Sequence, residues 1–381
     1  MTITTSTMKP VQVTPPKVER SPDSAPTAVT ARLILEDGST YEGVSFGATR
    51  SAAGEVVFNT GMVGYPESLT DPSYCGQILV CTYPLIGNYG VPDPDERDHL
   101  EYSLESTRLQ IAGLIVADYS RRYSHWEARR SLGDWLYTGG IPGLSGIDTR
   151  ALTKKLRHAG TMLGKIEFTG QPIDFHDPNK ENLVAKVSID RPVRYGKGTK
   201  RVVVVDSGAK HNIIRSLITR GVEVLRVPWN HDLKSETFDG LMLSNGPGDP
   251  ALYRDTFEQV RWAIDQKIPT FGVCLGNQML GLAIGAKTYK LKFGHRSQNQ
   301  PALEVGTDRA IMTSQNHGFA VDASSLPAGW REWYINLNDG TNEGLIHESG
   351  LFRSVQFHPE ASPGPVDASH LFDDFVSLVG R

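Results

Sequence analysis

The segment that decides the fold of this 381-residue chain is Thr270-Phe271-Gly272-Val273-Cys274-Leu275-Gly276. Residues 270–273 predict a short buried strand, and the apolar residues after Gly276 predict a helix. Glycines two residues before and two residues after Cys274 allow a sharp turn from strand to helix, where a nucleophile stands exposed above the sheet. An isolated cysteine is often only a small buried hydrophobic residue. The preceding strand and the flanking glycines favour the nucleophile.

Strands and helices alternate around this segment. Residues 202–205 are four consecutive valines, which is typical of a strand buried on both faces of a parallel sheet. Further strands are expected over 222–227, 241–244 and 270–273, and helices over 212–219 and 256–265. This order predicts an α/β domain over 201–381, with an open, mostly parallel sheet and flanking helices. Sites in such sheets form at the carboxyl ends of the strands.

A base for the thiol is predicted at the end of the last strand, over 352–357. His358-Pro359-Glu360 follows it, and Pro359 favours an extended conformation at His358. Side chains two residues apart then point to the same side, so Glu360 can bind one imidazole nitrogen while the other faces Cys274. That is the role of the acid in a catalytic triad. A lone histidine near a strand end is more often a surface residue, and the pairing with Glu360 favours catalysis.

A rigid loop is predicted after the strand at 241–244. Its sequence, Ser244-Asn245-Gly246-Pro247-Gly248-Asp249-Pro250, carries two glycines whose amides can approach a substrate closely. Such a loop supplies half of an oxyanion hole, and the N–H of Leu275 supplies the other half. The alternative is an ordinary proline- and glycine-containing turn.

The residues before 188 mix strands and helices without a repeating order, which predicts a smaller mixed α/β domain over 31–187. Its expected strands lie over 31–35, 55–59 and 77–82, and its expected helices over 124–137 and 149–158. The polar stretch 188–200 predicts a linker. Residues 1–30 hold seven Thr, five Pro and three Ser, and predict a disordered tail. They lack the apolar core of a secretory signal, and a cytoplasmic location is favoured over mitochondrial import.

Composition excludes several function classes. The 39 basic and 43 acidic residues give a net charge of −4, which argues against a nucleic-acid partner. Three cysteines without a CxxC pair predict neither a disulfide framework nor a metal site of the thiolate kind. The uncharged run 268–286 is long enough to cross a membrane, but its proline, amides and glycines favour a strand, turn and helix inside a globular domain.

Together these residues resemble the class I (triad) glutamine amidotransferases, on residues 271–278 and 357–360. More narrowly, the chain resembles the glutaminase subunit family of carbamoyl-phosphate synthase. The resemblance covers about residues 31–381, and its further motifs are residues 54–65, 69–74, 82–88, 146–150, 243–250, 314–321 and 362–365.

The resemblance implies hydrolysis of L-glutamine, with Cys274 as nucleophile, His358 as general base and acid, and Glu360 as its orienter. The implied glutamine contacts are Ser73, Gly246, Gly248, Leu275, Gln278, Asn316, Gly318 and Phe319. It also implies that ammonia passes through a tunnel to a large synthetase component. That component uses bicarbonate and two ATP to make carbamoyl phosphate for arginine and pyrimidines. No cofactor or metal is expected in this chain, since ATP and magnesium belong to the large component.

One departure and two alternatives remain open. The family commonly has histidine after the elbow glycine, where this chain has Asn277, which puts the glutaminase rate in doubt. One alternative is the amidotransferase of another synthase, such as anthranilate or GMP synthase. The other is a binding and regulatory subunit with weak catalysis. The length leaves no room for a synthetase, so we expect the chain to work as half of a heteromer.

Overall fold

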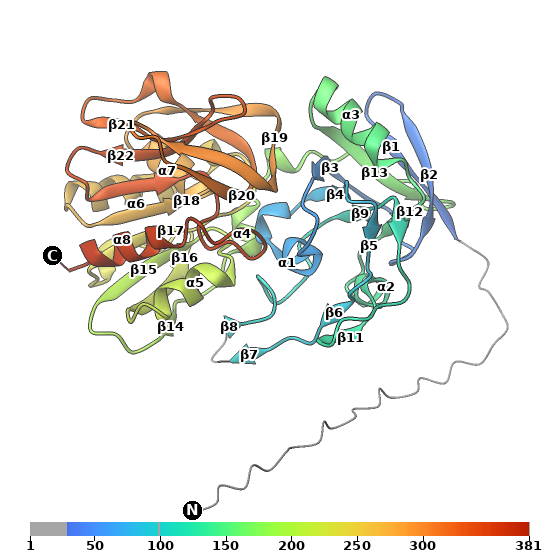
Figure 1. Cartoon of the computed structure of the whole chain (residues 1–381), viewed down its shortest axis with the longest axis horizontal. Helices are drawn as coiled ribbons and strands as arrows, with labels where there is room; N and C mark the ends of the chain where they lie inside the picture. Colours follow the sequence, from blue (N-terminus) through green and yellow to red (C-terminus); the bar gives the residue numbers. More distant parts are fainter. Residues whose placement is uncertain (1–28, 98–99, 381) are drawn as a thin grey trace, which may run out of the picture.

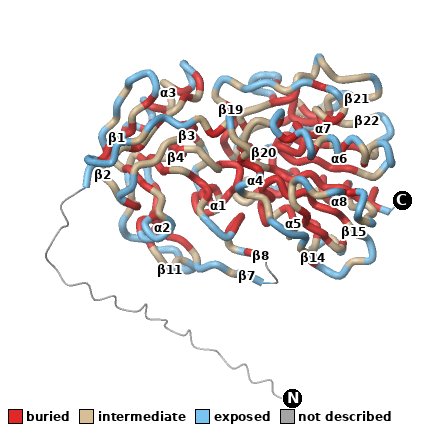
Figure 2. Tube along the Cα trace, turned by 180° about the vertical axis from the view of Figure 1, so that it is seen from behind, coloured by how far each residue is buried: buried red, intermediate tan, exposed pale blue. Residues whose placement is uncertain are grey.

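The computed structural model describes residues 29–97 and 100–380, which form two bodies joined side by side (Figure 1). The first body holds residues up to about 180, and the second holds the strands and helices from Val184 onward. The predicted tail over 1–30 lies almost wholly outside the described residues. Figure 2 shows buried segments in both bodies and exposed segments around their edges.

Seven strands of the first body close into a barrel. In barrel order they are β1 (Thr30–Leu35), β13 (Met162–Phe168), β3 (Ala52–Asn59), β4 (Gln77–Cys81), β9 (Gly113–Ile115), β12 (Gly143–Ser145) and β2 (Thr40–Ser45). In β13, buried and half-buried residues alternate strictly, which is the period of two that places every second side chain inside. β3, β4, β9 and β12 are parallel to their neighbours in this series, and the other barrel pairs are antiparallel. The sequence prediction of a mixed domain did not include this closure.

Short elements complete the first body. They are α1 (Tyr65–Thr70), α2 (Leu132–Thr138), α3 (Thr149–Ala159), η1 (Pro72–Tyr74), η2 (Pro178–Lys180), and the paired strands β5 (Leu85–Ile86) with β10 (Asp118–Tyr119), β6 (Val91–Pro92) with β11 (Ala128–Arg130), and β7 (Glu96–Arg97) with β8 (Leu100–Glu101). Helix α3 agrees with the predicted helix. Asp148 caps its first turn, and Leu152 and Leu156 pack into the barrel core.

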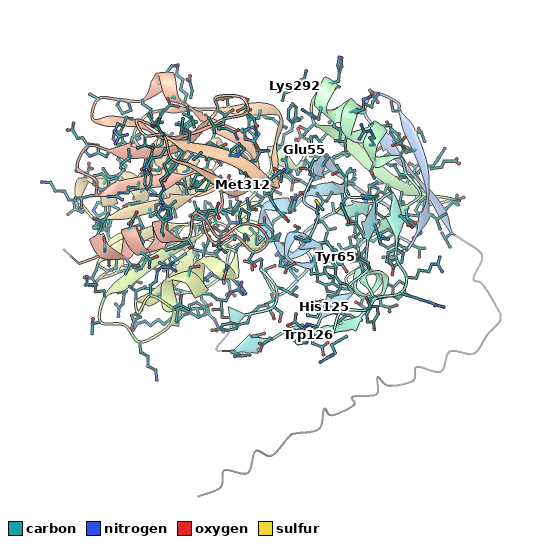
Figure 3. All side chains as sticks on the ribbon, viewed as in Figure 1. Glu55, Tyr65, His125, Trp126, Lys292 and Met312 are labelled. Carbon is teal, nitrogen blue, oxygen red and sulfur yellow. The ribbon has the colours of Figure 1, made fainter. Side chains whose placement is uncertain are left out.

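The predicted helix over 124–137 is wrong in its first half. Residues 128–130 form strand β11, and a helix begins only at Leu132, after Ser131 has capped it. Trp126, expected on the apolar face, is 77% exposed. Figure 3 shows it with His125 at the outer edge of the barrel domain. The spacing of the aromatic residues resembled a helical period, although the first part of this segment is an exposed loop, and this explains the wrong prediction.

The second body is built on one ten-stranded sheet. In sheet order its strands are β14 (Val193–Tyr195), β16 (Glu223–Pro228), β15 (Arg201–Asp206), β17 (Gly240–Leu243), β18 (Thr270–Val273), β23 (Phe352–Val355), β22 (Asn342–His347), β21 (Trp330–Asn336), β19 (Lys287–Glu304) and β20 (Ala310–Asp322). The run from β16 to β23 is parallel, and every pairing outside it is antiparallel. The expected mostly parallel sheet is therefore only the central half, because antiparallel strands between residues 287 and 347 extend it.

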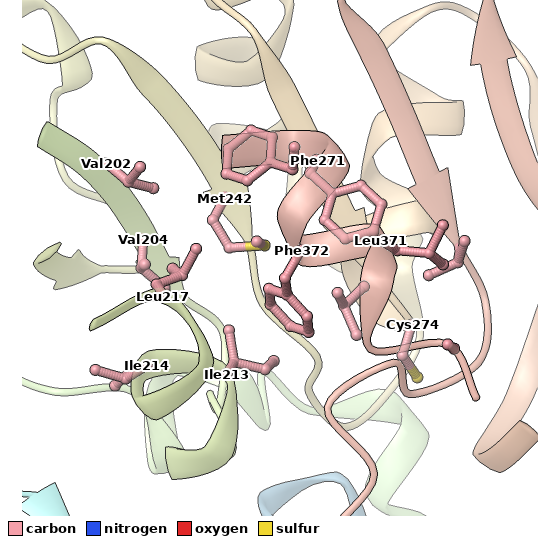
Figure 4. Close-up of a cluster of buried hydrophobic side chains, with 14 of the residues drawn as sticks. Val202, Val204, Ile213, Ile214, Leu217, Met242, Phe271, Cys274, Leu371 and Phe372 are labelled. Carbon is pink, nitrogen blue, oxygen red and sulfur yellow. The ribbon is translucent and has the colours of Figure 1, made fainter. Parts of the chain in front are cut away.

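Helices cover both faces of the parallel half. They are α4 (Val184–Val187), α5 (His211–Ile218), α6 (Arg254–Asp265), α7 (Leu275–Ala283) and α8 (His370–Leu378), with the short η3 (Leu233–Ser235), η4 (Pro250–Leu252) and η5 (Ala323–Ser325). Val202 and Val204 pack with α5 and α8, whereas Val203 and Val205 pack with α6 and α7. The four-valine run is thus buried on both faces, as predicted. Figure 4 shows Cys274 at the end of the core that Val202 and Val204 form with α5 and α8.

The predicted linker over 188–200 needs a correction. Its residues Val193–Tyr195 form β14, which pairs antiparallel with β16 at the edge of the large sheet. Tyr195 is buried in the core of the second body. The flanking proline and glycines suggested an irregular connection, and three residues are too few to show a strand period.

None of the helices in residues 29–97 and 100–380 is long and apolar enough to cross a bilayer.

Candidate functional site

Cys274 sits at a strained turn between β18 and α7. Its backbone has φ 55° and ψ −104°, and its N–H donates to the Val355 carbonyl at 2.9 Å. A non-glycine residue with positive φ is held there only by its surroundings. At Gly276 a Cβ atom would lie 2.3 Å from the Leu243 carbonyl oxygen, so only glycine fits. The predicted elbow is present, with Cys274 capping the N-terminus of α7, where the helix dipole favours a thiolate.

His358 and Glu360 form the predicted pair. His358 Nδ1 and Glu360 Oε1 are 2.6 Å apart, and both side chains are buried. The N–H of His358 donates to the Ser314 carbonyl at 2.9 Å, which fixes the segment against β20. Nε2 is buried without a hydrogen-bond partner in the described part of the chain, so it is the nitrogen available to exchange a proton with the Cys274 thiol.

The protonation of His358 follows from its neighbours. Burial alone would lower the pKa of its imidazole, but the charges of Glu360 and Cys274 raise this pKa to about 10. The imidazolium is therefore the neutral-pH form. An imidazolium next to a cysteine stabilises its thiolate, which is the reactive species.

Lys210 lies behind Glu360, and the sequence prediction missed it. Its Nζ is 3.1 Å from Glu360 Oε1 and also donates to the Ala361 carbonyl. The Lys210 N–H donates to Asn245 Oδ1 at 2.9 Å, so the residue joins the triad to the glycine loop. Lysine is rarely buried unless paired, and this pairing explains the burial.

The loop over 244–250 packs closely against α7. A Cβ atom at Gly246 would lie 2.0 Å from the Ser207 carbonyl oxygen and 2.8 Å from Leu275 Cδ2, so the backbone approaches as only glycine permits. The Tyr253 hydroxyl donates to the Pro247 carbonyl at 2.9 Å and holds the loop. Leu275 is the first residue of α7, and its N–H has no acceptor within the helix.

A cavity at the junction of the two bodies collects most of the predicted glutamine contacts. Its wall includes Cys274 together with Ser73, Gly246, Gly248, Gln278, Asn316, Gly318 and Phe319. Of the predicted substrate contacts, Leu275 is not on the wall, and its buried side chain packs behind the loop. Cys274 Sγ lies 3.6 Å from the Asn316 carbonyl oxygen, so the nucleophile and the cavity meet at β20. Ser73 comes from the first body.

Asp71 joins the bodies at this cavity and was missed as a site residue. Its carboxylate accepts from the Ser73 N–H at 2.9 Å and from Asn316 Nδ2 at 2.9 Å. Asn245 Nδ2 donates to Ser73 Oγ at 2.9 Å. One buried carboxylate of the barrel domain thus orients groups from both bodies. Its only sequence signal was its place within the motif over 69–74.

Asn277, the departure from the family pattern, belongs to a buried network behind the elbow. Its Nδ2 donates to Gln356 Oε1 at 3.1 Å, and it accepts from Ser354 Oγ at 2.8 Å. Gln278 donates to the same Gln356 oxygen and to the Phe319 carbonyl. Both polar groups of Asn277 are therefore occupied by this network.

A second cluster lies under the cavity wall. Donor atoms of His295, His317 and Glu343 lie within 4.8 Å of one another, a spacing that a metal ion can bridge. His295 instead stands between Asp339, at 2.8 Å, and Glu343, at 3.3 Å. Burial opposes the charged form of His295, but Glu343 and Asp339 raise the pKa of its imidazole.

Charged side chains complete the cavity wall. Glu55, drawn at the junction in Figure 3, accepts from Lys290 at 2.6 Å, from Thr161 at 3.1 Å and from Gln77 at 3.1 Å. Lys290 belongs to β19, so this ion pair links the two bodies. Arg296, also on β19, is the second cation on the wall.

Two family models match the chain. Residues 33–166 match the carbamoyl-phosphate synthase small chain, CPSase domain, and residues 203–378 match glutamine amidotransferase class-I. The boundary between the matches agrees with the boundary between the two bodies.

Relatives and solved structures add to this. The mitochondrial carbamoyl-phosphate synthase (ammonia) of Homo sapiens is 53% identical over 93% of this chain, and the multifunctional protein CAD of Squalus acanthias is 52% identical over 91%. The chain spans only 24% and 16% of the length of these two relatives. The crystal structure of a glutamine amidotransferase from Thermotoga maritima aligns with 43% of this chain and 77% of its own, at 19% identity and a TM-score of 0.36.

Proposed function

The chain belongs to the carbamoyl-phosphate synthase small chain family, with a class I glutamine amidotransferase domain, and from this premise we propose that it hydrolyses L-glutamine to supply ammonia to a synthetase. The observation that carries the proposal is the His358–Glu360 pair at 2.6 Å, set beside a cysteine on a strained elbow. That pair faces a cavity which both domains line.

The proposed reaction uses the triad in two steps. The Cys274 thiolate attacks the γ-amide carbon, and the resulting oxyanion is held by the N–H groups of Leu275 and of the glycine loop. His358 gives its Nε2 proton to the leaving nitrogen, so ammonia departs and a thioester remains. His358, now neutral, takes a proton from water as the water attacks the thioester. Glutamate leaves, and the thiolate and imidazolium are restored.

The proposed partner is a large synthetase component that binds ATP with magnesium and consumes the ammonia with bicarbonate. The relatives named above are several times longer than this chain, which supports a partner or a fused neighbour of that kind. The carbamoyl phosphate would serve arginine or pyrimidine synthesis. The cytoplasm is the proposed location.

A second candidate comes from the name of one relative. The Homo sapiens protein is named for ammonia, so a domain like this one can belong to an enzyme whose name specifies a different nitrogen source. The second candidate is therefore a regulatory or binding domain with weak glutaminase activity. The intact contacts of Cys274, His358 and Glu360 support the first candidate.

The test is Cys274→Ser in the complex with the large component. We expect it to abolish carbamoyl phosphate formation from glutamine and to leave formation from added ammonia unchanged, because only the nucleophile is lost. Cys75→Ser is the matched control, since Cys75 lies off the cavity wall, and it should keep both activities. Glutamine-dependent synthesis that survives Cys274→Ser would refute the assignment.

A further inference from the structure

Arg296 lies on the cavity wall next to the proposed reaction centre. In the β19–β20 ladder Arg296 pairs with Asn316, whose carbonyl oxygen lies 3.6 Å from Cys274 Sγ. Its side chain is within reach of Gly318, because a Cβ atom built at that glycine would lie 3.2 Å from Arg296 Nη2. The residue is only 4% exposed. A guanidinium therefore lines the same cavity as the nucleophile.

This guanidinium lacks the partner that other buried cations have. Within residues 29–97 and 100–380 it makes one hydrogen bond, from Nη1 to the Phe293 carbonyl at 2.9 Å, and its Nε has none. By contrast, Arg226 pairs with Asp206 at 2.9 Å, and Arg215 pairs with Glu105 at 2.6 Å. A buried charge without a counter-ion is costly, and an anion in the cavity would offset that cost. Burial lowers the pKa of Arg296 more than the charge of Glu55 raises it.

The nearby carboxylate makes no ion pair with Arg296 in the described residues, although its charge acts on the guanidinium through space. Glu55 also lines the cavity, but its two oxygens are taken by Lys290, Thr161 and Gln77. The wall thus carries two cations, Lys290 and Arg296, for one carboxylate. The wall therefore carries excess positive charge. The guanidinium of Arg296 presents its N–H donors in an arrangement that matches the two oxygens of a carboxylate.

We propose that Arg296 binds the α-carboxylate of the glutamine substrate and so selects for an anionic group at that end of the ligand. Cys274, Arg296 and Gly318 line the same cavity, so one ligand can contact the thiol and the guanidinium at once. Arg296 is then a specificity residue, separate from the triad. The inference rests on the proposed glutaminase function for the identity of the ligand.

The test compares L-glutamine with L-glutaminamide, in which a neutral carboxamide replaces the α-carboxylate. Both are assayed on the full chain by mass spectrometry of the γ-hydrolysis product. We expect Arg296→Gln to raise KM for L-glutamine at least about tenfold, the size of a lost charge-assisted hydrogen bond, while kcat changes little. The kcat/KM for L-glutaminamide should stay within about twofold, because that ligand never used the charge.

Two further variants make the result decisive. Lys292→Gln removes an exposed cation from the same strand, off the cavity wall, and should alter neither substrate. Arg296→Lys keeps the charge without the fork and should retain part of the preference for L-glutamine. This second variant also decides the matter should Arg296→Gln fail to fold. An equal loss for both substrates, or no loss for either, overturns the proposal.

Failure of the glutaminase function itself gives a different result. In that case the wild-type chain would hydrolyse neither substrate, which is the result expected for Cys274→Ser. Binding of L-glutamine and L-glutaminamide to Cys274→Ser, measured by calorimetry, still tests Arg296. Preferential binding of L-glutamine that Arg296→Gln removes supports the role of Arg296, and equal binding of the two ligands refutes it.

Discussion

At Glu360 a carboxylate with no solvent contact lies between two cations, His358 at 2.6 Å and Lys210 at 3.1 Å. Burial alone would raise the pKa of Glu360, but Lys210 and His358 lower it to about 2. The carboxylate therefore stays ionised throughout the neutral range. Its charge helps to raise the pKa of the His358 imidazole and so stabilises the imidazolium.

This chain of charges predicts the effect of Glu360→Gln. The amide keeps the shape of the side chain but not its charge, so the imidazolium of His358 loses stability. We expect kcat for glutamine hydrolysis to fall roughly 10² to 10⁴-fold. The pKa of the His358 imidazole, followed by NMR over a pH series, should fall, because Glu360 no longer raises it. Glu348→Gln, an exposed control, should leave both measurements unchanged, and an unshifted imidazole pKa in Glu360→Gln would contradict this account.

Residues of the site differ in how far the sequence could predict them. His358 and Glu360 are two positions apart, so an extended backbone alone brings them to the same side. Lys210 and Glu360 are separated by most of a domain, and only the packing of α5 against the triad segment brings them together. Arg296 resembles any surface arginine in the sequence, because its burial depends on the approach of the barrel domain.

The hairpin of β19 and β20 is the element that builds the cavity wall. It carries Arg296 on one strand and the residues from Asn316 to Phe319 on the other. His295 also belongs to β19, and its buried imidazole is paired with Asp339 and Glu343, which holds this strand in place. Burial lowers the pKa of His317, beside it, well below the usual value, so that ring is neutral.

The support by His295 gives a pH-dependent stability. Its folded-state pKa is raised, so its contribution is full below the unfolded value, about 6.5, and is lost as the pH rises through the folded value. We expect His295→Asn to lower Tm more at pH 6 than at pH 9, as measured by scanning calorimetry. His125→Asn, on the exposed edge of the barrel domain, should show no such dependence. A Tm difference that grew with pH would contradict the assignment.

At the scale of elements, sequence reasoning succeeded where the pattern is long and local. The valine strand β15, the strand β18 and the helix α3 agree with their predicted ranges. The antiparallel strands from β19 to β22 were missed, since their half-exposed polar residues resemble loops. β14 was missed because its three residues gain order only from the edge of the sheet.

On the scale of the whole molecule, the site exists only where the two bodies meet. The barrel domain supplies Asp71 and Ser73, and the amidotransferase domain supplies Asn245 and Asn316. Two domains and their approximate boundary were predictable from the change in sequence pattern. The closed barrel was not, because its parallel pairings join strands that are distant in sequence.

The junction predicts the effect of Asp71→Asn. The amide carries no charge and replaces one of the two acceptor oxygens by a donor, so Asn316 or Ser73 loses the oxygen that it donates to. We expect KM for glutamine to rise about tenfold, as for a lost hydrogen bond to a charged group, with a smaller change in kcat. Steady-state kinetics on the full chain measure this. Asp118→Asn, an exposed acid of the same domain, serves as control, and an unchanged KM in Asp71→Asn would show that the junction does not shape the site.

Asp71 also has a thermodynamic consequence. Because one carboxylate fixes groups from both domains around the cavity, the affinity for glutamine depends on the angle between the domains. Linkage is reciprocal, so bound glutamine must stabilise that angle by the same free energy. A protein that docks on the outer face of the barrel and fixes its orientation would therefore tune glutamine binding without touching the cavity, and glutamine would in turn strengthen the docking.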